Sequence, residues 1–277
     1  MSTPPCTVKP VGFTPPPNAI IIGSLTSWPS AVKLPMSLRR IFVDAIDGKA
    51  ASVGGERAHH LVRVARLKTG EKVEVTDQKK IYVARVLPTA DELIKFKIEK
   101  EIEPHPSERP ITLFLSIVKF ARFEWAIEKT TELGVNRIIP LVAEHSNRRL
   151  AATAEKRLSR WKRIADEAAQ QARRMAPSHI EMPIDFGQIA MRKMGSITFM
   201  LDRGGDPLLA ALEKLEPDNS MRELAFLVGP EGGWSASELE MAQCHGFITA
   251  SLGANVLRTE TAAVAALASS IKTYSKE

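Results

Sequence analysis

The chain has 277 residues, of which 44% are hydrophobic and 25% charged, a balance typical of globular proteins and unlike that of disordered or fibrous chains. Its length is sufficient for two domains, and no segment reaches the roughly 18 consecutive apolar residues of a membrane span. The formal net charge of +6 favours a polyanionic partner, and two cysteines, Cys6 and Cys244, are too few for a disulfide framework or a cysteine-based metal site.

The first 37 residues differ in composition from the rest of the chain. Roughly half of them are Ser, Thr or Pro, and none is Asp or Glu. Such a segment cannot bury enough apolar surface to fold, so we expect a disordered leader over 1–37. It resembles an organelle transit peptide, which would direct the protein to a plastid or another organelle. The alternative is a low-complexity tail on a cytoplasmic protein, with Met36 as an alternative start.

The pattern of residues 38–103 predicts a small β-barrel. The segments RRIFVDAI, EKVEVTD, IYVARVLP and LIKFKIEK are short and strand-like, with turn residues between them. Between the first two, a helix is expected from about Glu56 to just before Gly70, with Leu61, Val64 and Leu67 on its inner face. Its outer face is basic and carries Arg57, Arg63, Arg66 and Lys68.

A proline-rich segment at 104–110 is predicted to be a linker, and the pattern after it alternates between strands and helices. Strands are expected at 111–118 and in NRIIPLVA, IEMPI and SITFML, with one helix that ends at Gly134 and a long polar helix over about 154–174. This alternation predicts an α/β domain with a mostly parallel sheet and helices on both faces.

Two glycine-bearing loops near the C-terminus are the most informative feature. The first, in LVGPEGGW, follows an apolar strand at 224–228, and the second, in SLGANVLRTETAA, follows one at 247–252. Both therefore lie at carboxyl ends of strands, where open α/β sheets bind ligands. Gly229, Gly232 and Gly233 let a ligand approach the backbone closely. The alternative is two ordinary strand-to-helix turns.

Each loop leads into a helix. Ser235 and Glu238 form a predicted capping box for the first helix, which is expected to end near Gly246. The last helix, in TETAAVAALASSIKTYS, is rich in alanine, and its small side chains permit very close packing.

The segments KFARFEWAIEKTTELGVNRIIPLVAEHSN, EAAQQARRMAP, LVGPEGGWSASELE and LGANVLRTETAAVAAL together resemble the RsmE family, methyltransferases that modify N3 of a uridine in small-subunit (16S-type) ribosomal RNA. The resemblance implies a SPOUT-type α/β domain with a trefoil knot over 111–277, preceded by a PUA-like RNA-binding barrel over 38–103. It further implies a homodimer that acts on small-subunit rRNA or its ribosomal particle, without a membrane or a metal.

The same resemblance implies that the two glycine loops bind S-adenosyl-L-methionine. The residues that match the family's pocket are Leu227, Val228, Gly229, Pro230, Glu231, Gly232, Gly233, Leu252, Gly253, Asn255, Val256, Leu257 and Arg258.

RNA contacts are expected on the barrel, after the domain's first strand and at the end of the long polar helix. The candidates are Arg39, Arg40, His59, His60, Arg63, Arg66, Lys119, Arg122, Arg173 and Arg174. By the same resemblance, Lys119 and Arg122 would face either RNA or the active site. The polar helix carries further basic residues that favour a phosphate-facing surface, although for any one of them simple solvation of a helix is the alternative. His59 and His60 are adjacent, point in different directions and lack a partner cluster, so no metal site is predicted.

Methylation at N3 requires in-line positioning, and the imino proton of uracil must be removed or the ring anion stabilised. Arg258 is predicted to stabilise charge on a uracil oxygen, and Glu260 to act as the base. For Glu260 the alternative is a first-turn carboxylate that stabilises the helix N-terminus. For the whole chain the alternative is a noncatalytic RNA-binding or ribosome-assembly factor with the same fold.

Overall fold

The computed structural model describes residues 38–88, 93–103, 109–191, 195–215 and 222–271. The predicted leader at 1–37 and most of the predicted linker lie outside these residues. Among the described residues, no helix is both long enough and apolar enough to cross a membrane.

The N-terminal part is a six-stranded sheet with the order β1-β4-β5-β6-β3-β2. Its strands are β1 (Arg40–Phe42), β2 (Ala45–Asp47), β3 (Ala50–Gly54), β4 (Lys72–Thr76), β5 (Ile81–Val86) and β6 (Leu93–Ile102). All neighbours pair antiparallel except β1 and β4. Alternating apolar residues such as Val73, Val75, Ile94 and Phe96 form its core.

Two predictions for this part were wrong in detail. RRIFVDAI forms two strands, β1 and β2, because β1 pairs with β4 whereas β2 pairs with β3. The helix α1 (Gly55–Arg63) is shorter than expected, and Val64 just beyond it is 66% exposed. Leu67 does reach the core, but from the irregular segment after the helix.

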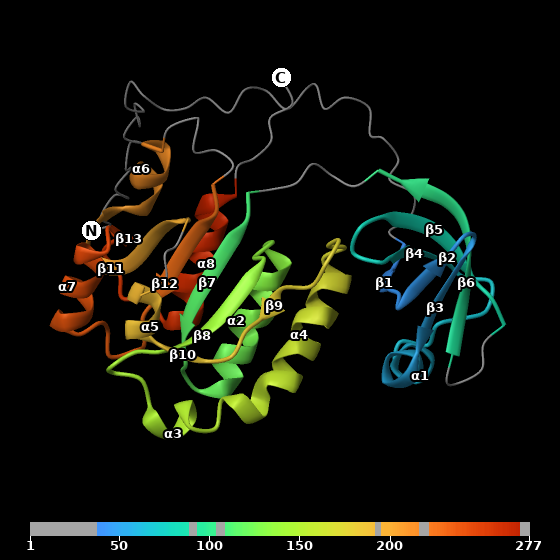
Figure 1. The fold of residues 1–277 in the computed structure, drawn as a ribbon, viewed down its shortest axis with the longest axis horizontal. Helices are drawn as coiled ribbons and strands as arrows, with labels where there is room; N and C mark the ends of the chain where they lie inside the picture. Colours follow the sequence, from blue (N-terminus) through green and yellow to red (C-terminus); the bar gives the residue numbers. More distant parts are fainter. Residues whose placement is uncertain (1–37, 89–92, 104–108, 192–194, 216–221, 272–277) are drawn as a thin grey trace, which may run out of the picture. The chain divides into compact units, whose positions relative to one another are not determined.

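The C-terminal part is a seven-stranded sheet with the order β10-β8-β7-β12-β11-β13 and β9 beside β8 (Figure 1). The strands are β7 (Ile111–Ser116), β8 (Arg137–Val142), β9 (His179–Ile180), β10 (Ile184–Asp185), β11 (Ile197–Pro207), β12 (Leu224–Val228) and β13 (Ile248–Ser251). Every described pairing is parallel, which confirms the predicted sheet.

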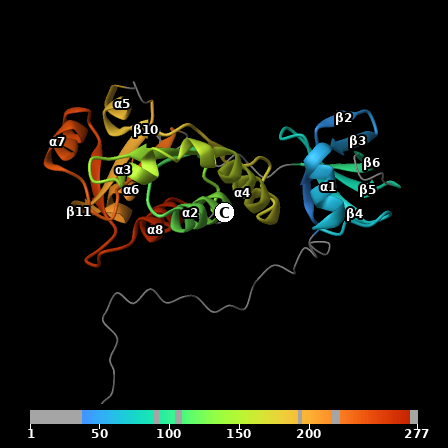
Figure 2. The same ribbon diagram turned by 90° about the horizontal axis from the view of Figure 1, so that it is seen from below.

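Helices cover both faces of this sheet. The helices are α2 (Phe120–Glu132), α3 (Arg148–Ala151), α4 (Leu158–Gln171), α5 (Phe186–Met191), α6 (Leu208–Glu213), α7 (Ala236–Cys244) and α8 (Thr259–Ser270), with a 3-10 turn at Glu155–Arg157. Buried side chains of α2, α4, α6 and α8 share one core cluster, and those of α5 and α7 share the other. Helices α2 and α8 pack directly against each other (Figure 2).

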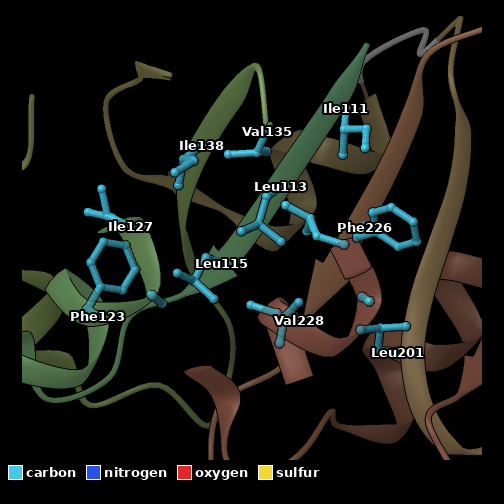
Figure 3. Close-up of a cluster of buried hydrophobic side chains, with 14 of the residues drawn as sticks. Ile111, Leu113, Leu115, Phe123, Ile127, Val135, Ile138, Leu201, Phe226 and Val228 are labelled. Carbon is cyan, nitrogen blue, oxygen red and sulfur yellow. The ribbon is translucent and has the colours of Figure 1, made fainter. Parts of the chain in front are cut away.

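The strand residues alternate between the two clusters. Leu113 and Leu115 of β7 meet Phe123 and Ile127 of α2 in one cluster, part of which is shown in Figure 3. Phe114, between them in sequence, packs on the opposite face. This central strand is buried on both faces, as its continuous apolar sequence predicted.

The long polar helix expected over 154–174 is shorter in the structure. It begins as a 3-10 turn, becomes α4 at Leu158 and ends at Gln171, and Arg173 then has a positive φ of 54°. The predicted strand in IEMPI is likewise two short strands, β9 and β10.

Candidate functional site

The two glycine loops lie at the same edge of the sheet. The first spans 229–235 after β12 and the second spans 252–258 after β13, with β11 between the two strands. The Thr259 hydroxyl, at the start of α8, donates a 2.9 Å hydrogen bond to the Gly229 carbonyl oxygen. This bond joins the first loop to the helix start that directly follows the second loop.

The first loop turns tightly around Trp234. The Gly233 amide donates to the Pro230 carbonyl at 2.9 Å, and Gly233 has a φ of +72°, which favours glycine. The buried indole of Trp234 donates to the Leu201 carbonyl of β11 at 2.9 Å. A Cβ on Gly229 would lie 3.0 Å from this ring, so a larger residue here would force the indole or the strand end to shift.

The segment after β8 supports the first loop, which the sequence analysis did not predict. His145 Nδ1 lies 3.0 Å from the Gly233 carbonyl oxygen, and a Cβ on Gly232 would lie 3.0 Å from His145 Cβ. The Glu144 amide donates to Glu238 Oε1 at 2.9 Å. The position of Glu144 and His145, directly after a parallel strand, was the available signal, because such residues share the carboxyl edge of the sheet.

The predicted capping box of α7 is confirmed. Ser235 Oγ accepts from the Glu238 amide, and the Glu238 carboxylate accepts from the Ser235 amide. The capping carboxylate is buried and also binds the Glu144 amide. One side chain therefore holds the end of the first loop and the segment after β8 together.

The second loop is the more exposed of the two. Gly253 has a φ of +113° and its amide donates to Ser251 Oγ at 3.2 Å. Residues 253–256 are exposed, and Val256 is 76% exposed, whereas Leu252 and Leu257 are half-buried. Exposed backbone and apolar side chains at this edge are available to a bound molecule.

The side chains of Leu227 and Val228, which were expected to border the pocket, are fully buried in the core clusters on opposite faces of β12. Only their backbone reaches the edge of the sheet. Pro230 is also buried, whereas Glu231 and Gly232 are exposed.

The two predicted catalytic residues flank the start of α8. Arg258 is the exposed N-cap residue of this helix. Glu260 is 8% exposed, and its Oε1 lies 3.7 Å from Arg122 Nε. Its Oε2 is buried without a hydrogen-bond partner among the described residues. Arg122 also forms an ion pair with Glu231 of the first loop.

The predicted RNA-contacting residues differ in exposure. His59, His60, Arg63 and Arg66 are exposed on and after α1. Arg39 is exposed and donates to the Ala65 carbonyl, and Lys119 is the exposed N-cap residue of α2. Two of the candidates point inward. Arg40 is buried and forms an ion pair with Glu74 at 2.8 Å, and Arg174 donates to the carbonyls of Thr131, Gly134 and Val135.

The basic residues around α4 are partly engaged with neighbouring helices. Arg160 forms a two-pronged pair with Glu124 of α2, and Arg157 lies over the Phe120 ring. Arg163 pairs with Glu167 on the same helix. The remaining exposed basic residues are Arg148, Arg149, Lys156 and Lys162. In the part of the chain that the structure describes, no group of His, Cys, Asp and Glu is arranged to hold a metal ion.

Comparison with known proteins identifies the family. A family model described as an RNA methyltransferase domain matches residues 105–271, and one described as an RNA methyltransferase PUA domain matches 53–99. Ribosomal RNA small subunit methyltransferase E from Synechocystis sp. is 34% identical, with 76% of this chain and 69% of the relative covered. The chain belongs to the ribosomal RNA small subunit methyltransferase E family.

Other members of the methyltransferase E family support this assignment. The protein from Mesomycoplasma hyopneumoniae is 31% identical, with 76% of this chain and 89% of the relative covered. The crystal structure of the Neisseria gonorrhoeae methyltransferase E, bound to S-adenosyl methionine, matches with a TM-score of 0.72 and 28% identity over 83% of this chain and 95% of that one. The resemblance to the family, the PUA-like N-terminal domain and the parallel α/β sheet are thereby confirmed.

Proposed function

We propose that this member of the methyltransferase E family transfers a methyl group from S-adenosyl-L-methionine to N3 of a uridine in small-subunit ribosomal RNA. The observation that carries the proposal is the joining of the two glycine loops by Thr259 and Gly229 at the carboxyl edge of the sheet. The family membership and the solved relative bound to S-adenosyl methionine support it.

The residues at this edge fit such a cofactor. The exposed backbone of 253–256 and of Glu231 and Gly232 offers amides and carbonyls to its polar groups. Glu231 and Glu260 place two carboxylates beside Arg122 at this edge, and carboxylates attract a cationic sulfonium. When bound, the cofactor supplies an electrophilic methyl group. We propose that both loops, with Leu252, Leu257 and the backbone of Leu227 and Val228, hold it.

Two side chains are proposed to act on the uracil. Arg258, exposed at the end of the second loop, stabilises negative charge on a uracil oxygen as N3 becomes nucleophilic. Glu260, the second residue of α8, accepts the imino proton. Its burial beside Arg122 supports the alternative as well, in which it orders the helix start and leaves proton removal to solvent.

The remaining assignments are also proposals. Residues 38–103 contact RNA through the exposed basic and histidine side chains around α1. Residues 111–277 contact RNA through Lys119, and 104–110 is the linker between these two domains. The C-terminal part carries the trefoil knot and forms a homodimer. Residues 1–37 act as an organellar transit peptide.

The experiment uses the full chain. It is titrated with S-adenosyl-L-methionine and then incubated with small-subunit particles from cells that lack this modification, and the methylated nucleotide is mapped. We expect binding and one methylated uridine, modified at N3. Arg258→Gln should abolish methylation and largely retain RNA binding. If the wild-type chain binds RNA but neither binds the cofactor nor methylates, it is a noncatalytic binding factor and the proposal fails.

A further inference from the structure

Arg122 lies at a junction between three elements. It is the third residue of α2, and two later residues of this helix, Phe123 and Ile127, are buried in the core cluster that α2 shares with α8. Its side chain is 30% exposed, so one part of it is packed and the other faces the edge where the loops lie. The core therefore fixes the backbone that carries Arg122.

From this position, Arg122 reaches the first loop and the first turn of α8, which directly follows the second loop. Its Nη1 pairs with Glu231 in the first loop, and its Nε lies 3.7 Å from Oε1 of Glu260, two residues beyond the second loop. Glu231 in the first loop and residues 253–256 in the second are exposed, so these parts of the loops are not held by the core. A side chain that binds the first loop and the start of α8 is thus well placed to set the distance between the two loops.

The two pairs differ in their environment. The Glu231 side chain is 53% exposed, so water competes for it and the pair by itself contributes little. The Glu260 side chain is 11% exposed, and one of its oxygens already lacks a hydrogen-bond partner among the described residues. A buried carboxylate that loses its cation is strongly disfavoured. Without Arg122, Glu260 would move toward water.

Movement of Glu260 would affect both loops. Glu260 is next to Thr259, whose hydroxyl binds the Gly229 carbonyl, and Thr259 follows Arg258 at the end of the second loop. A shift of the first turn of α8 would break the bond to Gly229 and displace the second loop together with it. The first loop would also lose the ion pair that links its Glu231 to Arg122.

We infer that Arg122 is a positioning residue of the cofactor site, which holds the two glycine loops at their binding distance through Glu231 and Glu260. This inference rests on the proposed function, since it concerns the affinity of the loops for S-adenosyl-L-methionine. Of the two roles that the sequence suggested for Arg122, at RNA or at the active site, the inference favours the second.

The test measures the affinity of the full chain for S-adenosylhomocysteine by calorimetric titration, and its affinity for a small-subunit rRNA fragment separately. Arg122→Gln should bind the cofactor product at least roughly tenfold more weakly, because a buried carboxylate loses its partner. Arg122→Lys should fall between wild type and Arg122→Gln, since a single ammonium cannot serve two carboxylates as a guanidinium does. RNA affinity should not change.

A double variant separates positioning from general damage. In Arg122→Gln with Glu260→Gln, the amide removes the uncompensated buried charge, so cofactor affinity should be higher than in Arg122→Gln alone. Arg137→Gln is the matched control. Arg137 also bridges two carboxylates, those of Glu181 and Glu223, but at the amino end of the same sheet. Its loss should leave cofactor affinity unchanged.

The inference is overturned if Arg122→Gln binds S-adenosylhomocysteine as wild type does, or if only its RNA affinity falls. If Arg122→Gln does not fold, Arg122→Lys decides: wild-type cofactor affinity overturns the inference, and a selective loss supports it. A wild-type chain that binds no cofactor would instead refute the proposed function, so the two failures are distinguishable.

Discussion

The hydroxyl of Thr259 donates a 2.9 Å hydrogen bond to the carbonyl oxygen of Gly229. Thr259 is 3% exposed, and Gly229 is the first residue after β12, so the bond ties the start of the last helix to the end of a central strand. Through this bond, a side chain that directly follows the second loop satisfies a backbone carbonyl of the first loop.

Replacement of Thr259 by valine tests this bond. Valine preserves the shape but leaves the part-buried Gly229 carbonyl without its donor, so the free energy of unfolding should fall by about 0.5–1.5 kcal/mol. S-adenosylhomocysteine should also bind more weakly, which titration would detect. Thr259→Ser retains the hydroxyl and should stay close to wild type. Equal cofactor affinity in the serine and valine variants would show that the bond does not position the loops.

Gly229→Ala should disturb the Trp234 ring. The new Cβ would lie 3.0 Å from Cε2 and 3.2 Å from Nε1, the atom that donates to the Leu201 carbonyl. We expect a loss of about 1–3 kcal/mol in unfolding free energy, as for other overpacked sites, and a change in tryptophan fluorescence. The control is Gly187→Ala in α5, where a Cβ meets nothing within 4 Å. It should be neutral or stabilising by up to about 1 kcal/mol.

Gly205→Ala should be more harmful than Gly229→Ala. Its Cβ would lie 2.5 Å from the backbone of Thr249 and Ala250, which cannot rotate away as a side chain can. This contact lies where the register of β11 against β13 shifts between Leu201 and Asp206. Chemical unfolding should show a loss of about 3 kcal/mol or more. A loss no larger than that of Gly229→Ala would mean that the two strands can separate at little cost.

The pH dependence of stability should reveal Asp166 on α4. Burial raises the pKa of this carboxyl above its ordinary value of 3.8. A raised pKa means that the folded state favours the protonated form, so stability is full below the unfolded-state pKa and is lost as pH rises through the folded-state pKa. Asp166→Asn should therefore be more stable than wild type at neutral pH.

Urea unfolding of both proteins at several pH values measures this effect. The advantage of Asp166→Asn should shrink as the pH falls toward 3.8, where the wild-type carboxyl is also neutral. An advantage that stays constant with pH would mean that the substitution acts through packing and not through charge.

Much of the fold could be predicted from periodicity and glycine placement. The strand at 224–228 has the bounds expected from its apolar run, and Ser235 with Glu238 caps α7 as the spacing indicated. Both features are local, because a strand buried on both faces and a capping box depend on residues only a few positions apart. Helix ends were less predictable. Helix α1 stops at Arg63, and the positive φ of Arg173 follows the end of α4.

The sequence alone determined the family, the order of strands and helices in the α/β domain and the presence of two glycine loops at strand ends, since each of these is written in short motifs. The tertiary structure decided which side chains support those loops. Arg122, Glu144 and His145 lie about ninety residues or more from the groups they contact. No local pattern encodes such a contact, because the order of parallel strands in the sheet alone brings these segments to one edge.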